Sequence, residues 1–259
     1  MTQSDRRQFL LRELLKEQPE YAGIQIPKDI EKQKAFLRSL MNVRPPKPVS
    51  QKFLAIQDAY LQEELQLREI TDGNMLPSIP LNPHIALWQG DITTLKADAI
   101  VNAANSTLLG CFQPLHSCID NCIHSQSGIQ LRLFCDTIMK RQGRSEPTGK
   151  AKITPAFNLP STYILHTVGP IVSGSVTEEH RRLLASCYRS CLELAEAYGL
   201  KSVAFCCIST GEFHFSNELA AKIAVQTVTA YMAQTKSRMK VIFNVFKDTD
   251  YEIYQHLLG

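Results

Sequence analysis

Ala99-Ile100-Val101-Asn102-Ala103-Ala104-Asn105-Ser106 is the stretch that decides the fold of this chain. Its apolar residues predict a buried strand, and its asparagines and serine lie where that strand ends. Amide and hydroxyl groups at such a position offer directional hydrogen bonds without charge, which suits ribose hydroxyls. A polar turn with Asx bonding would contain the same residues, so both interpretations stay open.

Short apolar runs alternate with longer helical patterns on both sides of this stretch, which is typical of an α/β domain. The strands that we expect cover residues 85–89, 97–102, 151–153, 162–168, 202–208 and 241–246. The expected helices cover about residues 118–141, 178–198, 216–235 and 249–258. Ligands of such sheets bind beyond the carboxyl ends of the strands, so the loops that follow strands form the candidate site.

The N-terminal part of the chain has a different pattern, so we expect two units. Residues 1–75 predict a helical extension, and residues 76–259 predict the α/β domain. Ser4, Asp29 and Ser50 are candidate caps for three helices in the extension. The apolar stripes of these helices predict either packing within the chain or a surface for a partner.

The composition is ordinary for a globular protein and argues against several classes of function. Hydrophobic residues make up 44% and charged residues 20%, and the net charge of +3 is too small to predict nucleic-acid or membrane binding. The sequence has no signal-peptide pattern and no apolar run long enough to span a membrane. We therefore expect a cytoplasmic chain whose eight cysteines are core residues, metal ligands or reactive thiols.

Two more loops carry polar residues after expected strands. Asp91 lies in a tight turn after the first core strand, where its carboxylate can accept a hydrogen bond from an adenine amino group. The segment from Ser209 to Phe213 lies between a strand and a helix. Its small residues let backbone amides approach a diphosphate at a helix terminus. Each pattern alone is also compatible with an ordinary turn.

Taken together, six segments of the chain resemble the macrodomain family in the family's own order. They are residues 90–93, 99–106, 147–151, 165–170, 208–211 and 241–246. The resemblance covers roughly residues 76–259 and implies a three-layer α/β/α sandwich with a mixed sheet that binds ADP-ribose.

The resemblance also implies which residues contact the ligand. Asp91 would bind adenine, Asn105 the distal ribose, and the loop that begins at Ser209 the diphosphate. For residues at the end of the last strand, a place in the core is an equal alternative. The implied ADP-ribose contacts are Asp91, Ile92, Asn105, Cys118, Ser209, Thr210, Gly211, Glu212, Phe213, Asn244 and Phe246.

After the asparagine-rich stretch, cysteines and histidines replace the run of glycines that is found in most hydrolytic macrodomains. Cys111, His116 and Cys118 form a Cys-x4-His-x-Cys cluster. Zinc favours thiolate and imidazole ligands, and three protein ligands leave a fourth position open, as catalytic sites require. The cluster is similar to that of the zinc-dependent macrodomain subgroup, which also has a helical N-terminal extension and implies these three ligands. Cys122 and His124 remain alternative ligands.

The subgroup resemblance implies a glycosidase-type hydrolase that removes mono-ADP-ribose from protein side chains. Asn105 would position the distal ribose, and Asp120 would orient a water or a ribose hydroxyl. Asp120 also suits a first helical turn, where an aspartate interacts favourably with the helix dipole. Whether zinc activates the water or holds the ribose stays open.

Relatives in the subgroup accompany a sirtuin-type ADP-ribosyltransferase and a lipoylated glycine-cleavage H-like protein, which are therefore the implied partners. Two other functions remain as alternatives. One is a reader that binds ADP-ribose without turnover and uses zinc only to order a loop. The other is an O-acetyl-ADP-ribose deacetylase.

Overall fold

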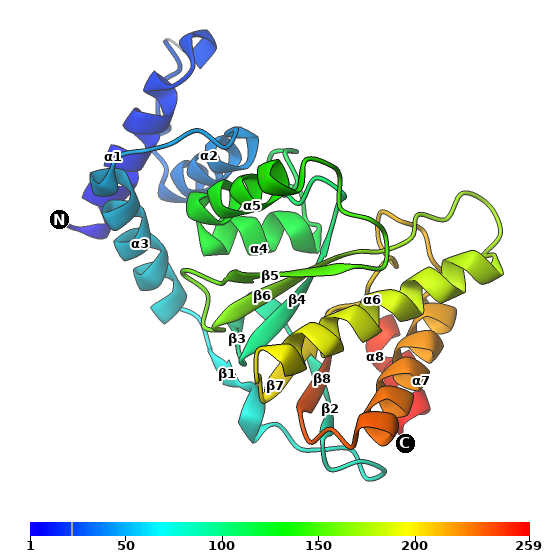
Figure 1. Cartoon of the computed structure of the whole chain (residues 1–259). Coiled ribbons are helices and arrows are strands. Elements are labelled where there is room, and N and C mark those ends of the chain that lie inside the picture. Colours follow the sequence, from blue (N-terminus) through cyan, green and yellow to red (C-terminus); the bar gives the residue numbers. More distant parts are fainter. Residues whose placement is uncertain (22) are drawn as a thin grey trace.

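The computed structural model describes residues 1–21 and 23–259, and its centre is a six-stranded mixed sheet (Figure 1). The strands stand in the order β2-β8-β7-β4-β6-β5, in which β5 runs antiparallel to β6 and the other neighbours are parallel. Their bounds are β2 Ile85–Gln89, β4 Ala99–Ala104, β5 Ala151–Pro155, β6 Tyr163–Val168, β7 Ser202–Phe205 and β8 Lys240–Val245.

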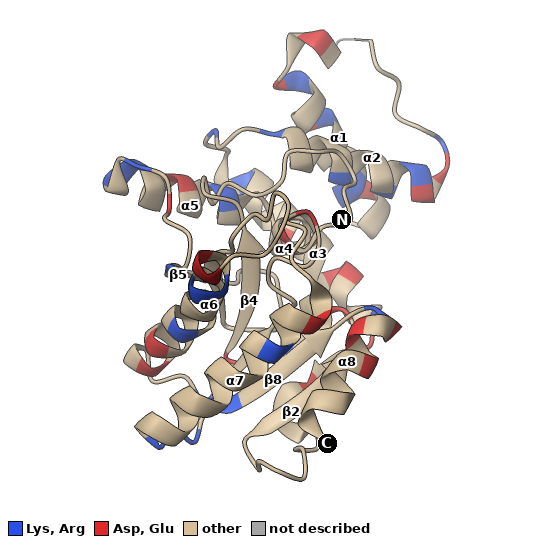
Figure 2. Cartoon of the chain, turned by 90° about the vertical axis from the view of Figure 1, so that its right-hand side faces the viewer, with Lys and Arg blue, Asp and Glu red and all other residues tan. Residues whose placement is uncertain are grey.

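Helices cover both faces of this sheet, so the expected three-layer α/β/α sandwich is confirmed (Figure 1). One layer contains α4 (Ile119–Ser127) and α5 (Ile129–Gln142). The other contains α6 (Glu178–Ala197), α7 (Asn217–Thr235) and α8 (Asp248–Leu258). Because both faces of the sheet are covered, its central strands are apolar, and β4 shows no charged residue along its length (Figure 2).

The structure corrects several expectations about the elements, and the strand expected over residues 97–102 is Ala99–Ala104. The single helix expected over residues 118–141 is two helices, because Gly128 between them has φ of +97°, which residues with a Cβ rarely adopt. The strand expected over residues 202–208 ends at Phe205, where the chain turns into a loop. The expected cap Ser4 is wrong, because Thr2 forms a capping box with Asp5.

The N-terminal part forms three helices with a small core of their own. These helices are α1 (Gln3–Lys16), α2 (Ile30–Val43) and α3 (Gln51–Gln66). Asp29 and Ser50 cap α2 and α3 as predicted. The apolar sides of the three helices pack against one another and against Ile129 of α5, so their stripes are buried within the chain.

The remaining elements are short. The 3-10 turns are η1 (Pro19–Tyr21), η2 (Gly73–Met75) and η3 (Ile92–Thr94). Strand β1 (Thr71–Asp72) pairs in parallel with β3 (Leu95–Lys96) and forms a separate two-stranded sheet. Among the described residues, no helix combines the length and the apolar character that a membrane crossing requires.

Candidate functional site

The carboxyl ends of four neighbouring strands bring the expected binding segments to one edge of the sheet. Asp91 follows β2, Asn105 follows β4, and Phe246 follows β8. The loop of residues 209–215 follows β7. Because these four strands are adjacent and parallel, the segments lie at the same edge, where ligands of open α/β sheets bind. The structure therefore brings together the three loops that the sequence singles out.

Asn105 donates hydrogen bonds to Asp120 and to Gly110, which lies at the start of the loop after Asn105. Its Nδ2 donates to Asp120 Oδ2 at 3.2 Å and to the Gly110 carbonyl oxygen at 3.0 Å. The other carboxylate oxygen of Asp120 accepts from Asn102 Nδ2 at 2.8 Å. Burial raises the pKa of Asp120 to about 6, although Asn102, Arg132 and Asn105 oppose the shift. Both carboxylate oxygens of Asp120 therefore accept from asparagine amides, and Oδ1 also lies 3.6 Å from His124 Nε2.

His166 is a structural residue, as its position inside an apolar strand suggests. It is fully buried on β6. Its Nε2 lies 2.9 Å from Thr154 Oγ1, and its Nδ1 lies 3.2 Å from Asn102 Nδ2. Burial lowers the pKa of His166 to about 3, so the ring is neutral and serves to fix the asparagine that holds Asp120.

The loop of residues 109–118 brings two thiols and an imidazole together. The ligand atoms of Cys111, His116 and Cys118 all lie within 4.8 Å of one another, and Cys111 Sγ is 3.7 Å from His116 Nδ1. In a tetrahedral zinc site, bonds of about 2.3 Å to sulfur and about 2.1 Å to nitrogen separate sulfur and nitrogen ligands by about 3.6 Å. The separation of Cys111 Sγ and His116 Nδ1 therefore fits a zinc ion, and Cys118 Sγ lies within 4.8 Å of both.

Cys118 is fixed by the beginning of α4. It is the N-cap of that helix, and its Sγ accepts from the Asn121 backbone N–H at 3.4 Å. Burial raises the pKa of its thiol to about 12, and the neighbouring Cys111 adds to the shift. A bound metal would displace the thiol proton and stabilise the thiolate there.

Cys122 and His124, the alternative ligands, have other neighbours. Cys122 Sγ lies 3.7 Å from Arg38 Nη2. His124 is buried, and the potential ligand atoms of His124, Cys135 and His166 lie within 4.8 Å of one another. In the described part of the chain, neither residue joins the first cluster.

The loop of residues 209–215 is held mainly by its own backbone. Ser209 has φ of +68°, and the Phe215 N–H donates to its carbonyl oxygen at 3.0 Å. The loop packs closely on Gly169, which follows β6, because a Cβ at that glycine would lie 2.0 Å from Ser209 Oγ. No atom lies within 4 Å of a Cβ built on Gly211, so the tip of the loop is open.

The two loops approach each other at His116 and Glu212. Glu212 Oε1 lies 3.6 Å from His116 Nε2, while Nδ1 of the same ring faces Cys111. A carboxylate on the second nitrogen of an imidazole orients a histidine that binds a metal through the first. The predicted phosphate-binding loop therefore also contacts the candidate metal ligand.

Asp91 is held from two sides. Its Oδ1 accepts from the backbone N–H and the hydroxyl of Thr93 at 2.9 Å and 2.7 Å. Its Oδ2 forms an ion pair with Arg68, which follows α3 and also donates to Thr93. The N-terminal extension therefore reaches the residue that is expected to bind adenine.

The remaining residues expected to contact ADP-ribose, which are Asn244 and Phe246 near adenine and the Ile92 amide near a phosphate, differ in exposure. Asn244 is buried, and its Nδ2 donates to the Gly90 carbonyl oxygen at 2.9 Å, so it holds the turn before Asp91. Ile92 is buried in η3. Phe246 is 74% exposed and lies at the end of β8, where its ring is free to contact a ligand.

Known proteins match this chain over most or all of its length. A model of the Macro domain family matches residues 101–224. A relative from Treponema medium, named protein-ADP-ribose hydrolase, is 56% identical over the whole of both chains. This chain belongs to the Macro domain family. A relative of the same name from Staphylococcus aureus strain MSSA476 is 49% identical and covers 96% of this chain and 94% of its own.

Solved macro domains share the fold of this one. The Trypanosoma brucei macrodomain in complex with ADP-ribose has a TM-score of 0.67 at 28% identity and covers 86% of this chain and 95% of its own. The Oceanobacillus iheyensis macrodomain with ADP has a TM-score of 0.60 at 36% identity, over 66% of this chain and 88% of its own.

Sequence reasoning missed the contacts that the extension makes with the macro domain site. Arg68 binds Asp91 from 23 residues away, and Arg38 Nη2 donates to the His116 carbonyl oxygen across 78 residues. No local pattern marks either arginine, because its partner is far along the chain. In the sequence, a basic residue directly after a helix, such as Arg68, has no feature that distinguishes it from an arginine exposed to solvent.

Proposed function

We propose that this macro domain is a zinc-dependent hydrolase that binds ADP-ribose and removes mono-ADP-ribose from protein side chains. The observation that carries the proposal is the Cys111, His116 and Cys118 cluster beside Asn105 at the ligand edge of the sheet. The names of the relatives and the ADP-ribose complex of a similar structure support the nucleotide sugar as ligand.

The residues of the 109–118 loop suit zinc in number and type. Two sulfurs and one nitrogen at this separation are ligands that zinc prefers, and three protein ligands are the number usual for a catalytic site. When bound, zinc would supply a Lewis acid and a fixed positive charge at the ribose end of the site.

The chain's own side chains supply binding and orientation. Asn105 and Asp120 fix each other and the start of the 109–118 loop. The 209–215 loop presents backbone amides before the first turn of α7, where they would hold the diphosphate. In the reaction, water would give its hydroxyl to the distal ribose carbon and its second proton to the released side chain. Holding the ribose in place lowers the barrier by removing the need to align it.

The substrate to test first is a lipoylated glycine-cleavage H-like protein, modified by a sirtuin-type ADP-ribosyltransferase. This choice rests on the resemblance of the cysteine and histidine cluster to that of the zinc-dependent subgroup. An acidic side chain is the acceptor that we propose on that carrier.

The deciding experiment measures zinc content and release of ADP-ribose from a modified protein in the same preparation. We expect about one zinc per chain, loss of turnover after chelation, and recovery when zinc is added back. Binding of ADP-ribose without any turnover would instead identify a reader. Preferential cleavage of O-acetyl-ADP-ribose in a parallel assay would identify a deacetylase.

A further inference from the structure

The 109–118 loop has an unfavourable backbone conformation directly before its ligand His116. Leu115 has φ of +57°, in the left-handed region that residues with a branched side chain rarely occupy. Its side chain is 46% exposed, so packing of that side chain does not hold the conformation. Support from outside the loop is therefore important for the position of the imidazole.

Asn42, near the end of α2, provides part of that support. Its Oδ1 accepts from the Leu115 backbone N–H at 3.0 Å, and its Nδ2 donates to Ser125 Oγ at 2.9 Å. Asn42 is 1% exposed, so both ends of its amide are fixed in the interior. The hydrogen bond from Leu115 holds the backbone immediately before the ligand.

Arg38, one turn earlier on α2, contacts the same loop in two ways. Its Nη2 donates to the His116 carbonyl oxygen at 2.8 Å and to Asn121 Oδ1 at 2.9 Å. Asn121 Nδ2 in turn donates to the carbonyl oxygens of Gln113 and Cys111, at 2.9 Å and 3.4 Å. Arg38 therefore contacts one ligand residue directly and a second through Asn121.

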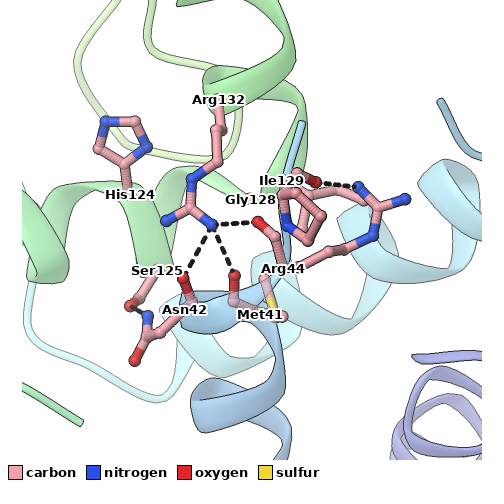
Figure 3. A pocket seen from close by; sticks show the side chains of 9 residues that line it. Met41, Asn42, Arg44, His124, Ser125, Gly128, Ile129 and Arg132 are labelled. Atoms are coloured by element: carbon pink, nitrogen blue, oxygen red, sulfur yellow. Dashed lines mark hydrogen bonds between the residues drawn. The ribbon is translucent and has the colours of Figure 1, made fainter. Parts of the chain in front are cut away.

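Arg132 of α5 fixes α2 relative to the loop. Its Nη1 donates to the carbonyl oxygens of Met41, Asn42 and Arg44 at the C-terminal end of α2, beside a small cavity (Figure 3). Its Nε donates to the Leu109 carbonyl oxygen at 2.6 Å, where the loop begins. One guanidinium thus satisfies unpaired helix carbonyls and joins α2 to the loop.

We propose that α2 of the N-terminal extension holds the 109–118 loop in the geometry that binds zinc, with Arg38 and Asn42 as positioning residues. The inference rests on the zinc site proposed above. A loop that is already ordered loses less conformational freedom when it binds a metal. Residues that orient metal ligands typically contribute about 10- to 100-fold to metal affinity.

The test is titration of the metal-free full chain with Co²⁺, which absorbs visible light strongly in a tetrahedral site with thiolate ligands. We expect Arg38→Ala and Asn42→Ala each to weaken Co²⁺ binding about tenfold. Arg38→Lys keeps a cationic donor and should recover part of the loss. The thermal unfolding midpoint, measured in parallel, shows whether each variant is folded.

Two control variants separate positioning from general damage to the extension. Lys32→Ala removes an exposed side chain on the same helix. Arg6→Ala breaks the ion pair between α1 and α3 at Glu63, away from the loop. Both should bind Co²⁺ as the unsubstituted chain does, even if Arg6→Ala lowers the unfolding midpoint.

The outcomes distinguish this inference from the proposed function. Unchanged Co²⁺ affinity in folded Arg38→Ala and Asn42→Ala would overturn the positioning role and leave the zinc site standing. An equal loss in Arg6→Ala would also overturn it, because the effect would then follow stability alone. If the unsubstituted chain gives no tetrahedral Co²⁺ spectrum, the zinc site itself is wrong and the inference falls with it.

Discussion

The 109–118 loop and the 209–215 loop meet at the same edge of the sheet, yet they are held in different ways. Backbone hydrogen bonds hold the 209–215 loop. Two lie within it, from Phe215 to Ser209 and from His214 to Gly211, and one comes from the Val172 N–H to the Phe213 carbonyl oxygen. Side chains of three helices hold the 109–118 loop, since α2, α4 and α5 all donate to its carbonyl oxygens.

The difference means that a nearby stretch of sequence can largely determine the 209–215 loop, whereas the 109–118 loop depends on helices far along the chain. A loop held mainly by backbone hydrogen bonds requires small residues and close packing on a neighbouring segment, here at Gly169 and Val172. A loop held by distant side chains requires the helices that carry them. The N-terminal extension is therefore part of the site, because it supports the 109–118 loop through α2 and Asp91 through Arg68.

The largest expected effect comes from replacing a thiol in the 109–118 loop. Cys118→Ser keeps a side-chain oxygen that can cap α4 but removes the soft sulfur ligand. We expect metal affinity to fall by more than about 100-fold, beyond the usual effect of an outer residue, and hydrolysis to be abolished. Metal titration and turnover of a modified protein measure the two effects.

Cys122→Ser is the matched control, because it makes the same chemical change one turn further along α4 and outside the cluster, and a serine hydroxyl can still accept from Arg38 Nη2 as the Cys122 sulfur does. It should retain metal binding and turnover. Equal losses in both variants would contradict the assignment of Cys111, His116 and Cys118 as the ligands. Full activity in Cys118→Ser would contradict a metal-dependent hydrolysis.

A smaller effect is expected where a new side chain would displace the 209–215 loop. In Gly169→Ala the added Cβ would lie 2.0 Å from Ser209 Oγ and 2.9 Å from Ile208 Cγ2, so the loop must shift. We expect about tenfold weaker ADP-ribose binding by calorimetry, which corresponds to about 1.4 kcal/mol. Metal affinity should change less than ADP-ribose affinity, because Glu212 of the displaced loop faces His116 but side chains of α2, α4 and α5 hold the 109–118 loop.

Gly211→Ala tests whether close contact, and not loss of a glycine, causes that effect. No atom lies within 4 Å of a Cβ at this position, so the metal-free, ligand-free chain should keep its unfolding midpoint. A lowered midpoint in Gly169→Ala alone would support the close packing of Gly169 on Ser209. Identical midpoints and affinities for Gly169→Ala and the unsubstituted chain would contradict it.

Local patterns predict most of the fold and the candidate ligands, because their determinants lie close together in the sequence. The strand over residues 85–89 has the expected bounds, and the Cys-x4-His-x-Cys spacing brings three donor atoms together as expected. Gly128 was missed as a helix break, because a single glycine is compatible with a continuous helical pattern.

Contacts between distant residues were not predictable from the sequence. Arg38 and Asn42 contact the 109–118 loop across 78 and 73 residues, and both look like ordinary polar positions of an amphipathic helix. The pairing of Asp120 with Asn102 is hidden for a related reason, because the asparagine lies within an apolar strand. Such contacts depend on how α2 and α4 pack, which a single sequence does not specify.

The smallest expected effect is a pH dependence that arises at Asp120, in the first turn of α4 directly after the 109–118 loop. Burial raises the pKa of Asp120 to about 6. Above that pH the carboxylate accepts from Asn102 and Asn105, and below it a proton occupies one of the oxygens and weakens that pairing. Turnover should therefore decline on acidification, because protonation of Asp120 removes one acceptor from the asparagine amides.

Stability should respond in the opposite direction, which separates this group from general acid denaturation. A folded-state pKa above the usual value of 3.8 means that the folded chain binds the proton more tightly than the unfolded chain. Asp120 therefore stabilises the fold fully below about pH 4, and that contribution is lost as the pH rises through 6. The free energy of unfolding, measured in denaturant between pH 7 and pH 5, should increase on acidification by more in the unsubstituted chain than in Asp120→Ala. If turnover and the free energy of unfolding both fall on acidification, and by the same amount in the unsubstituted chain and in Asp120→Ala, then Asp120 is not the titrating group.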